Sequence, residues 1–389
     1  MNLSIGIVGL PNVGKSTLFN ALLKKQQALV ANYPFATIEP NIGVVAVPDP
    51  RLEILADIIA KDSIASPGTG QYLASLQNDN LRKPPIKPAT VEFVDIAGLV
   101  KGASEGAGLG NKFLSHIREV SVIAHVVRAF EDPNIVREGS VGVREDYETV
   151  RTELALSDLE SISRRKTQKS NPPASRQGGQ LKSQNELLER LEKSLNKEEK
   201  LDASNLSKED ADFVRGLNLL SLKPELIVLN VSEEEYIEEK FEKLIYMYIS
   251  TFGVDKEKIV VISAKIEAEL AALDEEEQRE YLKDLGLEFS GLERLIQKAY
   301  EELGLISFLT AGEKEVRAWT VRLGSTSLTA SGEIHTDFMK KFIKAEVVRF
   351  DDFVEYGGWK GSREHGKSLL EGRDYVILDG DVIEFKIGS

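Results

Sequence analysis

Apolar runs alternate with helix-like patterns through the first three quarters of the chain, and this alternation is typical of a parallel α/β sheet. Each run is short and bounded by turn or helix signals, so we interpret it as a buried strand. The predicted strands are Ser4–Val8, Ile42–Val47, Thr90–Asp95, Val122–Val127, Leu226–Asn230 and Ile259–Ser263. We therefore expect an α/β domain with a parallel-rich sheet and helices on both of its faces.

The long stretch between the fourth and fifth predicted strands has a helical pattern instead. Glu148–Lys166 and Leu181–Lys200 are two helical segments joined by a turn rich in proline and glycine. The second segment carries a narrow apolar seam, and the first offers a partner stripe. The seam is Leu181, Leu188, Leu191 and Leu195, and the stripe is Val150, Leu154 and Ile162. We predict an antiparallel coiled-coil hairpin over residues 148–206, inserted into a sheet domain that comprises residues 1–147 and 207–304.

From about Leu305 the pattern changes to short strands and Gly-rich turns, which predicts a small α+β domain over residues 305–389. Of its two tryptophans, Trp319 is expected in the core, and Trp359, set among glycines, is the candidate for an exposed anchor. The predicted elements are strands at Val316–Leu323, Lys344–Arg349, Tyr375–Leu378 and Val382–Lys386, and a helix at Thr336–Phe342.

The composition of the 389 residues is that of a soluble globular protein, with a net charge of −14 and no cysteine. The absence of cysteine excludes disulfides and thiolate metal sites, and no apolar stretch is long enough to span a bilayer. The first strand begins almost at once, which leaves no room for a leader peptide. We expect a cytoplasmic monomer that binds neither membranes nor DNA.

One segment departs from the acidic average. Residues 164–182 hold six Lys or Arg and no acid. Charge runs of this kind are usually solvated helix ends, and the alternative is local contact with RNA phosphates. The complete absence of acid favours RNA.

The chemistry begins at Gly9-Leu10-Pro11-Asn12-Val13-Gly14-Lys15-Ser16, a complete GxxxxGK[ST] motif between a predicted strand and a predicted helix. Successive backbone N–H groups and a helix N-terminus form a cradle for polyphosphate. Lys15 adds positive charge at the β- and γ-phosphates, and the Ser16 hydroxyl can bind Mg²⁺. The motif predicts that the chain binds a nucleoside triphosphate.

Further parts of a phosphoryl-transfer site follow in the expected order. Thr37 is placed to complete the Mg²⁺ shell, and Asp95 ends a predicted strand as the aspartate of a DxxG motif. The Gly98 N–H is then available to the γ-phosphate. The next residue, Leu99, cannot orient water as the glutamine of Ras-like enzymes does, so another group must. The candidates are His116 and a monovalent cation, K⁺, near Asn12.

Base recognition also departs from the GTPase pattern Asn-Lys-x-Asp, because this chain has Asn230-Val231-Ser232-Glu233. The longer Glu233 displaces the carboxylate that would pair with guanine, and the lysine stem is absent. Asn230 can still contact a purine, and Ser263 and Ala264 fit the last loop that faces the base. The pattern favours ATP over GTP.

Together these motifs resemble the YchF-type Obg-like ATPases. The resemblance runs from GLPNVGKST through NYPFATIEPN and DIAGLVKGAS to KEVRAWTVRLG and GEIHTDFMKKFIKAEV. It implies three parts: a P-loop G domain, an inserted coiled-coil hairpin and a C-terminal TGS domain of β-grasp type. It further implies Mg²⁺-dependent hydrolysis of ATP to ADP and phosphate, and association with ribosomes in translation or the stress response. The family's nucleotide contacts fall on Asn12, Val13, Gly14, Lys15, Ser16, Thr17, Asn230 and Val231, and its Mg²⁺ contacts on Ser16, Thr37 and Asp95.

Two alternatives stay open on the residues alone. A conventional GTP-hydrolysing, translation-associated GTPase would require Glu233 to act as the missing aspartate. A non-catalytic regulator that binds the ribosome under nucleotide control would require only the phosphate-binding loop.

Overall fold

A computed structural model describes residues 3–32, 41–65, 83–96, 109–132, 142–169, 178–197 and 206–388. Contacts divide the chain into two compact units. The first is Met1–Val45 with Glu92–Ala299, and the second is Ala46–Val91 with Tyr300–Ser389. Residues 46–91, which the sequence-based boundaries assign to the first domain, thus group with the C-terminal residues.

The first unit is built on a six-stranded sheet with the order β2-β4-β1-β5-β6-β7. β1 pairs in parallel with β4 and β5, and the series continues in parallel through β6 and β7. All six strands predicted from the apolar runs form, and their ends differ from the prediction by at most one residue. The strands are β1 (Ser4–Val8), β2 (Ile42–Ala46), β4 (Thr90–Asp95), β5 (Val122–Arg128), β6 (Glu225–Asn230) and β7 (Ile259–Ile262). Since the carboxyl ends of parallel strands meet at one edge, the residues that follow β1, β4, β6 and β7 gather there.

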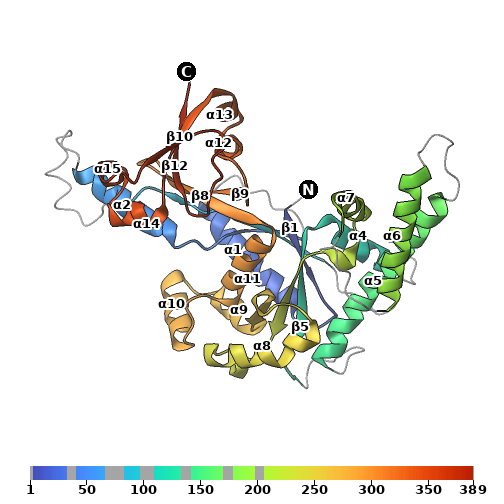
Figure 1. The fold of residues 1–389 in the computed structure, drawn as a ribbon. Helices are drawn as coiled ribbons and strands as arrows, with labels where there is room; N and C mark the ends of the chain where they lie inside the picture. Colours follow the sequence, from blue (N-terminus) through green and yellow to red (C-terminus); the bar gives the residue numbers. More distant parts are fainter. Residues whose placement is uncertain are drawn as a thin grey trace. The chain divides into compact units, whose positions relative to one another are not determined.

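Helices lie on both faces of this sheet (Figure 1). α1 packs on α9, while α5 contacts β5 and α8. The helices of the unit are α1 (Lys15–Asn32), α4 (Leu109–Glu119), α5 (Val143–Lys169), α6 (Gly178–Asn196), α7 (Lys208–Leu217), α8 (Glu238–Phe252), α9 (Ala264–Leu270), α10 (Glu275–Asp284) and α11 (Gly291–Glu302), with 3₁₀ turns η1 (Leu220–Leu222), η2 (Glu233–Glu235) and η3 (Lys256–Lys258). In the described part of the chain, no helix combines the length and the apolar character needed to cross a membrane.

The predicted hairpin is formed by α5 and α6, which run side by side away from the sheet (Figure 1). Its apolar cluster is Ile162, Leu187, Leu188, Leu191, Leu195, Val214 and Leu219, so α7 contributes to it as well. Val150 and Leu154 are buried but lie outside this cluster. The stripe predicted for the first helix was therefore wrong in part, because α5 begins at Val143 and its first half packs on β5 and α8.

Buried polar contacts fix this first half of α5 to the sheet. The Glu225 carboxylate at the start of β6 lies 2.9 Å from His125 Nδ1 and accepts a hydrogen bond of 3.2 Å from the Tyr147 hydroxyl. Further along α5, the fully buried Asp158 accepts backbone N–H bonds of 2.8 Å from Leu220 and Ser221. α5 is thus anchored at two levels before it continues into the hairpin.

The second unit holds another six-stranded sheet, with the order β11-β10-β12-β8-β9-β3. β8 and β9 are antiparallel, and β12 lies parallel to β8 in the centre, which is a β-grasp arrangement. α2 packs against β8, β9 and α14. The elements are α2 (Arg51–Ala65), β3 (Ile86–Lys87), β8 (Leu305–Ala311), β9 (Val316–Arg322), α12 (Ser327–Ile334), α13 (Thr336–Lys341), β10 (Phe342–Val348), α14 (Phe350–Glu355), α15 (Trp359–Glu364), β11 (Leu369–Glu371) and β12 (Val382–Ile387).

Two predictions for this unit were wrong. Residues 375–378 form no strand, and only one isolated bridge joins Val376 to Thr326. Trp359 is no exposed anchor, because its indole N–H donates to the Ala311 carbonyl at 3.0 Å and its ring packs edge-on against Phe353.

Candidate functional site

The loop between β1 and α1 has the backbone of a phosphate-binding loop. Gly9 has φ +152° and Gly14 has φ +102°, and Asn12 between them is also left-handed at φ +61°. A methyl group at Gly14 would overlap the Asn230 amide, and one at Gly9 would lie 2.5 Å from the Val126 carbonyl oxygen. Glycine is therefore required at both positions for close packing as well as for backbone conformation.

Lys15 is the buried cation of this loop. Its side chain is 7% exposed, and Nζ donates to the Leu10 carbonyl at 2.5 Å. Burial lowers the pKa of the Lys15 ammonium to about 8, and the nearby Asp95 carboxylate opposes that shift. Ser16 and Thr17 lie exposed in the first turn of α1. The loop thus presents one ammonium group and the N-terminus of a helix at the same point, which is an arrangement that binds polyphosphate.

Asp95 lies at the carboxyl end of β4, where the strand register pairs it with Ile7. It is half-buried, and desolvation raises the pKa of its carboxyl group while Lys15 opposes the shift. A carboxylate, a serine hydroxyl and bound phosphates are the hard oxygen ligands that Mg²⁺ takes at nucleotide sites. Asp95 and Ser16 therefore fit the ion. Among the described residues no three His, Asp or Glu side chains gather as a separate metal site.

On the base side, Asn230 ties two loops together. Its Nδ2 donates to the Val13 carbonyl at 2.8 Å, and its Oδ1 accepts from the Ala264 N–H at 2.9 Å. The side chain is 3% exposed. Asn230 therefore holds the phosphate-binding loop against the loop after β7, in addition to facing the pocket.

The segment after β6 is joined to α9 by two further contacts. The Glu233 carboxylate forms an ion pair with the Lys265 ammonium. Behind this pair, the buried Tyr236 hydroxyl donates to Glu267 Oε1 at 2.9 Å, and the same oxygen accepts the Gly291 N–H at 2.7 Å. Burial raises the pKa values of both Tyr236 and Glu267, so the phenol stays protonated and donates. The two base-facing loops are thus held in one fixed spacing.

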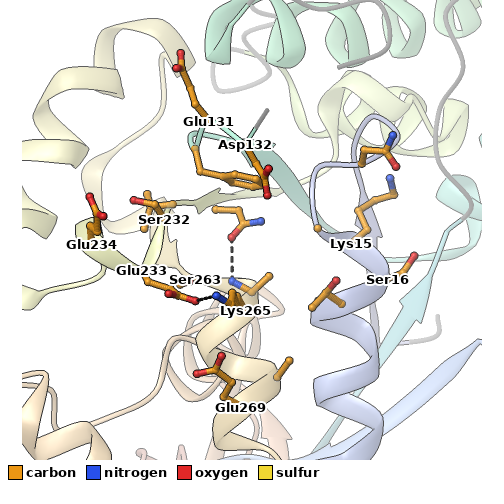
Figure 2. A pocket seen from close by; sticks show the side chains of 18 of the residues that line it. Lys15, Ser16, Glu131, Asp132, Ser232, Glu233, Glu234, Ser263, Lys265 and Glu269 are labelled. Atoms are coloured by element: carbon orange, nitrogen blue, oxygen red, sulfur yellow. Dashed lines mark hydrogen bonds and ion pairs between the residues drawn. The ribbon is translucent and has the colours of Figure 1, made fainter. Parts of the chain in front are cut away.

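These parts enclose a pocket of about 920 Å³. Figure 2 shows Lys15 and Ser16 on one side of it and the Glu233–Lys265 pair on the other. The lining residues are Asn12, Gly14, Lys15, Ser16, Thr17, Phe130, Glu131, Asp132, Asn230, Val231, Ser232, Glu233, Glu234, Ser263, Ala264, Lys265, Ala268, Glu269 and Ala272. Most of the predicted nucleotide contacts are therefore brought together. Val13 is the exception, since its side chain is buried and its carbonyl accepts from Asn230.

Sequence reasoning missed Phe130, Glu131 and Asp132, which line the pocket directly after β5. Arg128 lies over the Phe130 ring, 4.5 Å from its centroid, and so supports the ring at the rim. An aromatic face in this position can stack on a purine. The signal that could have found these residues is their position just after β5, the strand that lies between β1 and β6 in the sheet.

Other predicted residues lie apart from the pocket or outside the described residues. Thr37 and Gly98 are outside them, as is Leu99. His116 is exposed on α4 and does not line the pocket. Its catalytic role stays a prediction.

A parallel sheet with a GxxxxGK[ST] loop at its carboxyl edge, facing two joined base-side loops, defines a P-loop nucleoside-triphosphate-binding protein. Residues 4–165 match a family described as 50S ribosome-binding GTPase, and residues 305–388 match YchF-GTPase_C, described as a protein of unknown function (DUF933). The chain belongs to the YchF family.

Relatives of full length support this assignment. The chain is 44% identical over 389 residues to the "Ribosome-binding ATPase YchF" of Pasteurella multocida, with 99% of each chain covered. It is 43% identical over 387 residues to the protein of that name in Bacillus subtilis, again with 99% of each covered. The solved structure of the Schizosaccharomyces pombe YchF GTPase matches with a TM-score of 0.80 and 34% identity, covering 99% of this chain and 98% of that one.

Proposed function

We propose that this chain is a Mg²⁺-dependent hydrolase that converts ATP to ADP and phosphate, prefers ATP over GTP, and acts as a nucleotide switch associated with the ribosome. The base preference rests on one observation. The two groups able to bind guanine, the Glu233 carboxylate and the Ala264 N–H, already make contacts within the protein. The names of the full-length relatives support the activity and the ribosome as partner.

Guanine offers two N–H donors at N1 and the 2-amino group, and it needs a free carboxylate to accept them. Its O6 needs a donor. Here the Glu233 carboxylate binds the Lys265 ammonium, and the Ala264 N–H donates to Asn230. Guanine would compete with Lys265 and Asn230 for these groups, whereas adenine makes no demand on the carboxylate because it lacks the N1–H and the 2-amino group.

Hydrolysis requires water to attack the γ-phosphorus as the bond to the β–γ bridging oxygen breaks. Lys15 supplies positive charge to the phosphates, and the first turn of α1 supplies N–H groups. Ser16, Asp95 and Thr37 would hold Mg²⁺, which would supply positive charge to the phosphates. In this proposal Gly98 donates its N–H to the γ-phosphate. His116, or a K⁺ ion near Asn12, orients the water that Leu99 cannot.

The ribosome contact is assigned to the α5–α6 hairpin and the C-terminal TGS domain, with domain limits at residues 148–206 and 305–389. The run of six Lys or Arg without acid between residues 164 and 182 supports the hairpin as an RNA-facing element. A cytoplasmic monomer that acts in translation or the stress response fits these assignments.

Calorimetric titration with non-hydrolysable ATP and GTP analogues and Mg²⁺, in potassium and in sodium, tests the base preference. We expect tighter ATP binding, and a potassium effect if a cation near Asn12 takes part. Phosphate release then tests the catalytic assignment in Lys15→Ala, with Lys24→Ala as the matched control, because Lys24 is an exposed lysine on the same helix.

Tighter GTP binding would establish the conventional GTPase, with the Glu233–Lys265 pair opening to admit guanine. Hydrolysis that continues undiminished in Lys15→Ala would refute the catalytic assignment. A Lys15→Ala chain without turnover that still supports the function in cells would establish the non-catalytic regulator.

A further inference from the structure

A second cavity, of about 240 Å³, lies where α4, α5 and the end of α7 meet. It shares no lining residue with the nucleotide pocket. We call it the hairpin-root niche, and its lining residues are Arg118, Ser161, Ile162, Arg164, Arg165, Leu217 and Leu219.

Three guanidinium groups and no carboxylate line the niche. Arg118 is held in place by the Ser157 and Ser161 hydroxyls, which its Nη2 reaches at 2.8 and 3.1 Å. Arg164 also pairs with Glu160, one turn back on α5. Arg165 is exposed and, within the described ranges, makes no hydrogen bond or ion pair. The unpaired Arg165 guanidinium and the Arg118 guanidinium, which the two serines hold in place, therefore face the same small cavity.

The acids nearby offset only part of this charge. Asp158 lies close enough to Arg118 for an electrostatic interaction, but its carboxylate is fully buried and bound to the N–H groups of Leu220 and Ser221. Glu160 is matched by Arg164. In a chain of net charge −14, the niche is a local site for an anion.

The shape of the niche limits the kind of anion. Its volume is below the roughly 300–1,000 Å³ of pockets that enclose a drug-sized ligand. Arginine forks match the oxygens of a phosphate, and the cavity is floored by the buried Ile162 and Leu219 and the half-buried Leu217. A free phosphate ion would meet only the cavity, whereas a polynucleotide held there also reaches the other Lys and Arg of residues 164–182.

We propose that the hairpin-root niche binds one backbone phosphate of RNA. This inference rests on the proposed ribosome association and adds a defined contact to it, at the root of the hairpin and not at its far end. The positive run of residues 164–182 begins at this niche, so the RNA backbone is attracted along α5 from the same point.

The test measures binding of a fluorescent 20-nucleotide RNA to the full-length chain by anisotropy between 50 and 300 mM salt. Arg165→Ala removes the unpaired guanidinium. We expect about 10-fold weaker binding at the lowest salt and a smaller salt dependence, by about one in log Kd against log salt. Arg215→Ala is the matched control, because Arg215 is exposed on α7, outside the niche, and paired with Asp212.

Equal affinities and salt slopes for Arg165→Ala and Arg215→Ala would overturn the proposal. So would displacement of the RNA by millimolar inorganic phosphate at constant ionic strength, or equally tight binding of a polyglutamate peptide. Arg165→Ala should hydrolyse ATP at the wild-type rate. If the wild-type chain sediments with ribosomes while Arg165→Ala binds RNA normally, only the niche assignment fails. If the wild-type chain hydrolyses nothing, the proposed activity fails and the RNA result stands by itself.

Discussion

Asn230→Ala tests whether the amide that joins the phosphate-binding loop to the loop after β7 is required for the site. The substitution leaves the Val13 carbonyl and the Ala264 N–H without their partner. A buried polar group left unpaired costs about 1–3 kcal/mol. Because the adjoining pocket admits water, which can replace part of the loss, we expect a total of about 2–4 kcal/mol.

The free energy of unfolding in urea and the Kd of Mg²⁺-ATP, measured by calorimetry, together report this cost. We expect lower stability and at least ~10-fold weaker ATP binding, since a nucleotide must then align two loops that are no longer joined. Asn230→Asp should also fail, because a carboxylate can accept from the Ala264 N–H but would place an oxygen against the Val13 carbonyl.

Ser232→Ala is the control, since Ser232 lines the same pocket and, among the described residues, its hydroxyl bonds only to Glu235, at 3.3 Å. An Asn230→Ala chain with the stability and ATP affinity of Ser232→Ala would refute the reasoning. The two backbone groups would then be satisfied without the amide, and the loops would be aligned by other contacts.

Two further predictions concern pH. Burial holds the pKa of Lys15 at about 8, and only the ammonium form attracts phosphate, so nucleotide affinity should fall between pH 7 and 9. Titration calorimetry checks this, and Lys15→Arg should abolish the pH dependence whatever its affinity; an unchanged wild-type affinity at pH 9 would contradict it. In the second unit, Arg363 lowers the pKa of Glu346 to about 2, so the carboxylate stabilises the fold above its unfolded pKa, and this contribution is lost as pH falls from about 4.5 to 2. Glu346→Gln should cost about 1–2 kcal/mol at pH 7 and much less at pH 2, measured by unfolding followed through Trp319 and Trp359, which both lie in this unit; an equal cost at both pH values would contradict the assignment.

The strands of the first sheet could be predicted closely because each is a buried apolar run bounded by polar residues. In the second unit the local pattern was less informative. Residues 375–378 are apolar enough for a strand, yet Ile377 enters the core while its N–H bonds to the Ser325 carbonyl in a loop. The spacing of apolar residues in α5 predicted a helix correctly. That spacing does not specify which element each face of the helix contacts.

At the nucleotide pocket, too, local sequence pattern could predict only part of the arrangement. The GxxxxGK[ST] motif identified Lys15 and Ser16 because the chemistry lies in consecutive residues. Phe130 could not be found in this way, since its role depends on the order of strands in the sheet, and that order is set by long-range pairing. The contact between Lys265 and Glu233 likewise joins α9 and η2, which follow different strands.

α5 also has a mechanical consequence. Its 27 residues make a rod of about 40 Å, with one half clamped to β5, β6 and η1 and the other half carrying the hairpin. A tilt of ~10° of the free half, ~20 Å long, would move its far end through ~3.5 Å. Small shifts among the strands that end at the nucleotide pocket are therefore magnified, by leverage alone, into displacements of several ångströms at the far end of α5.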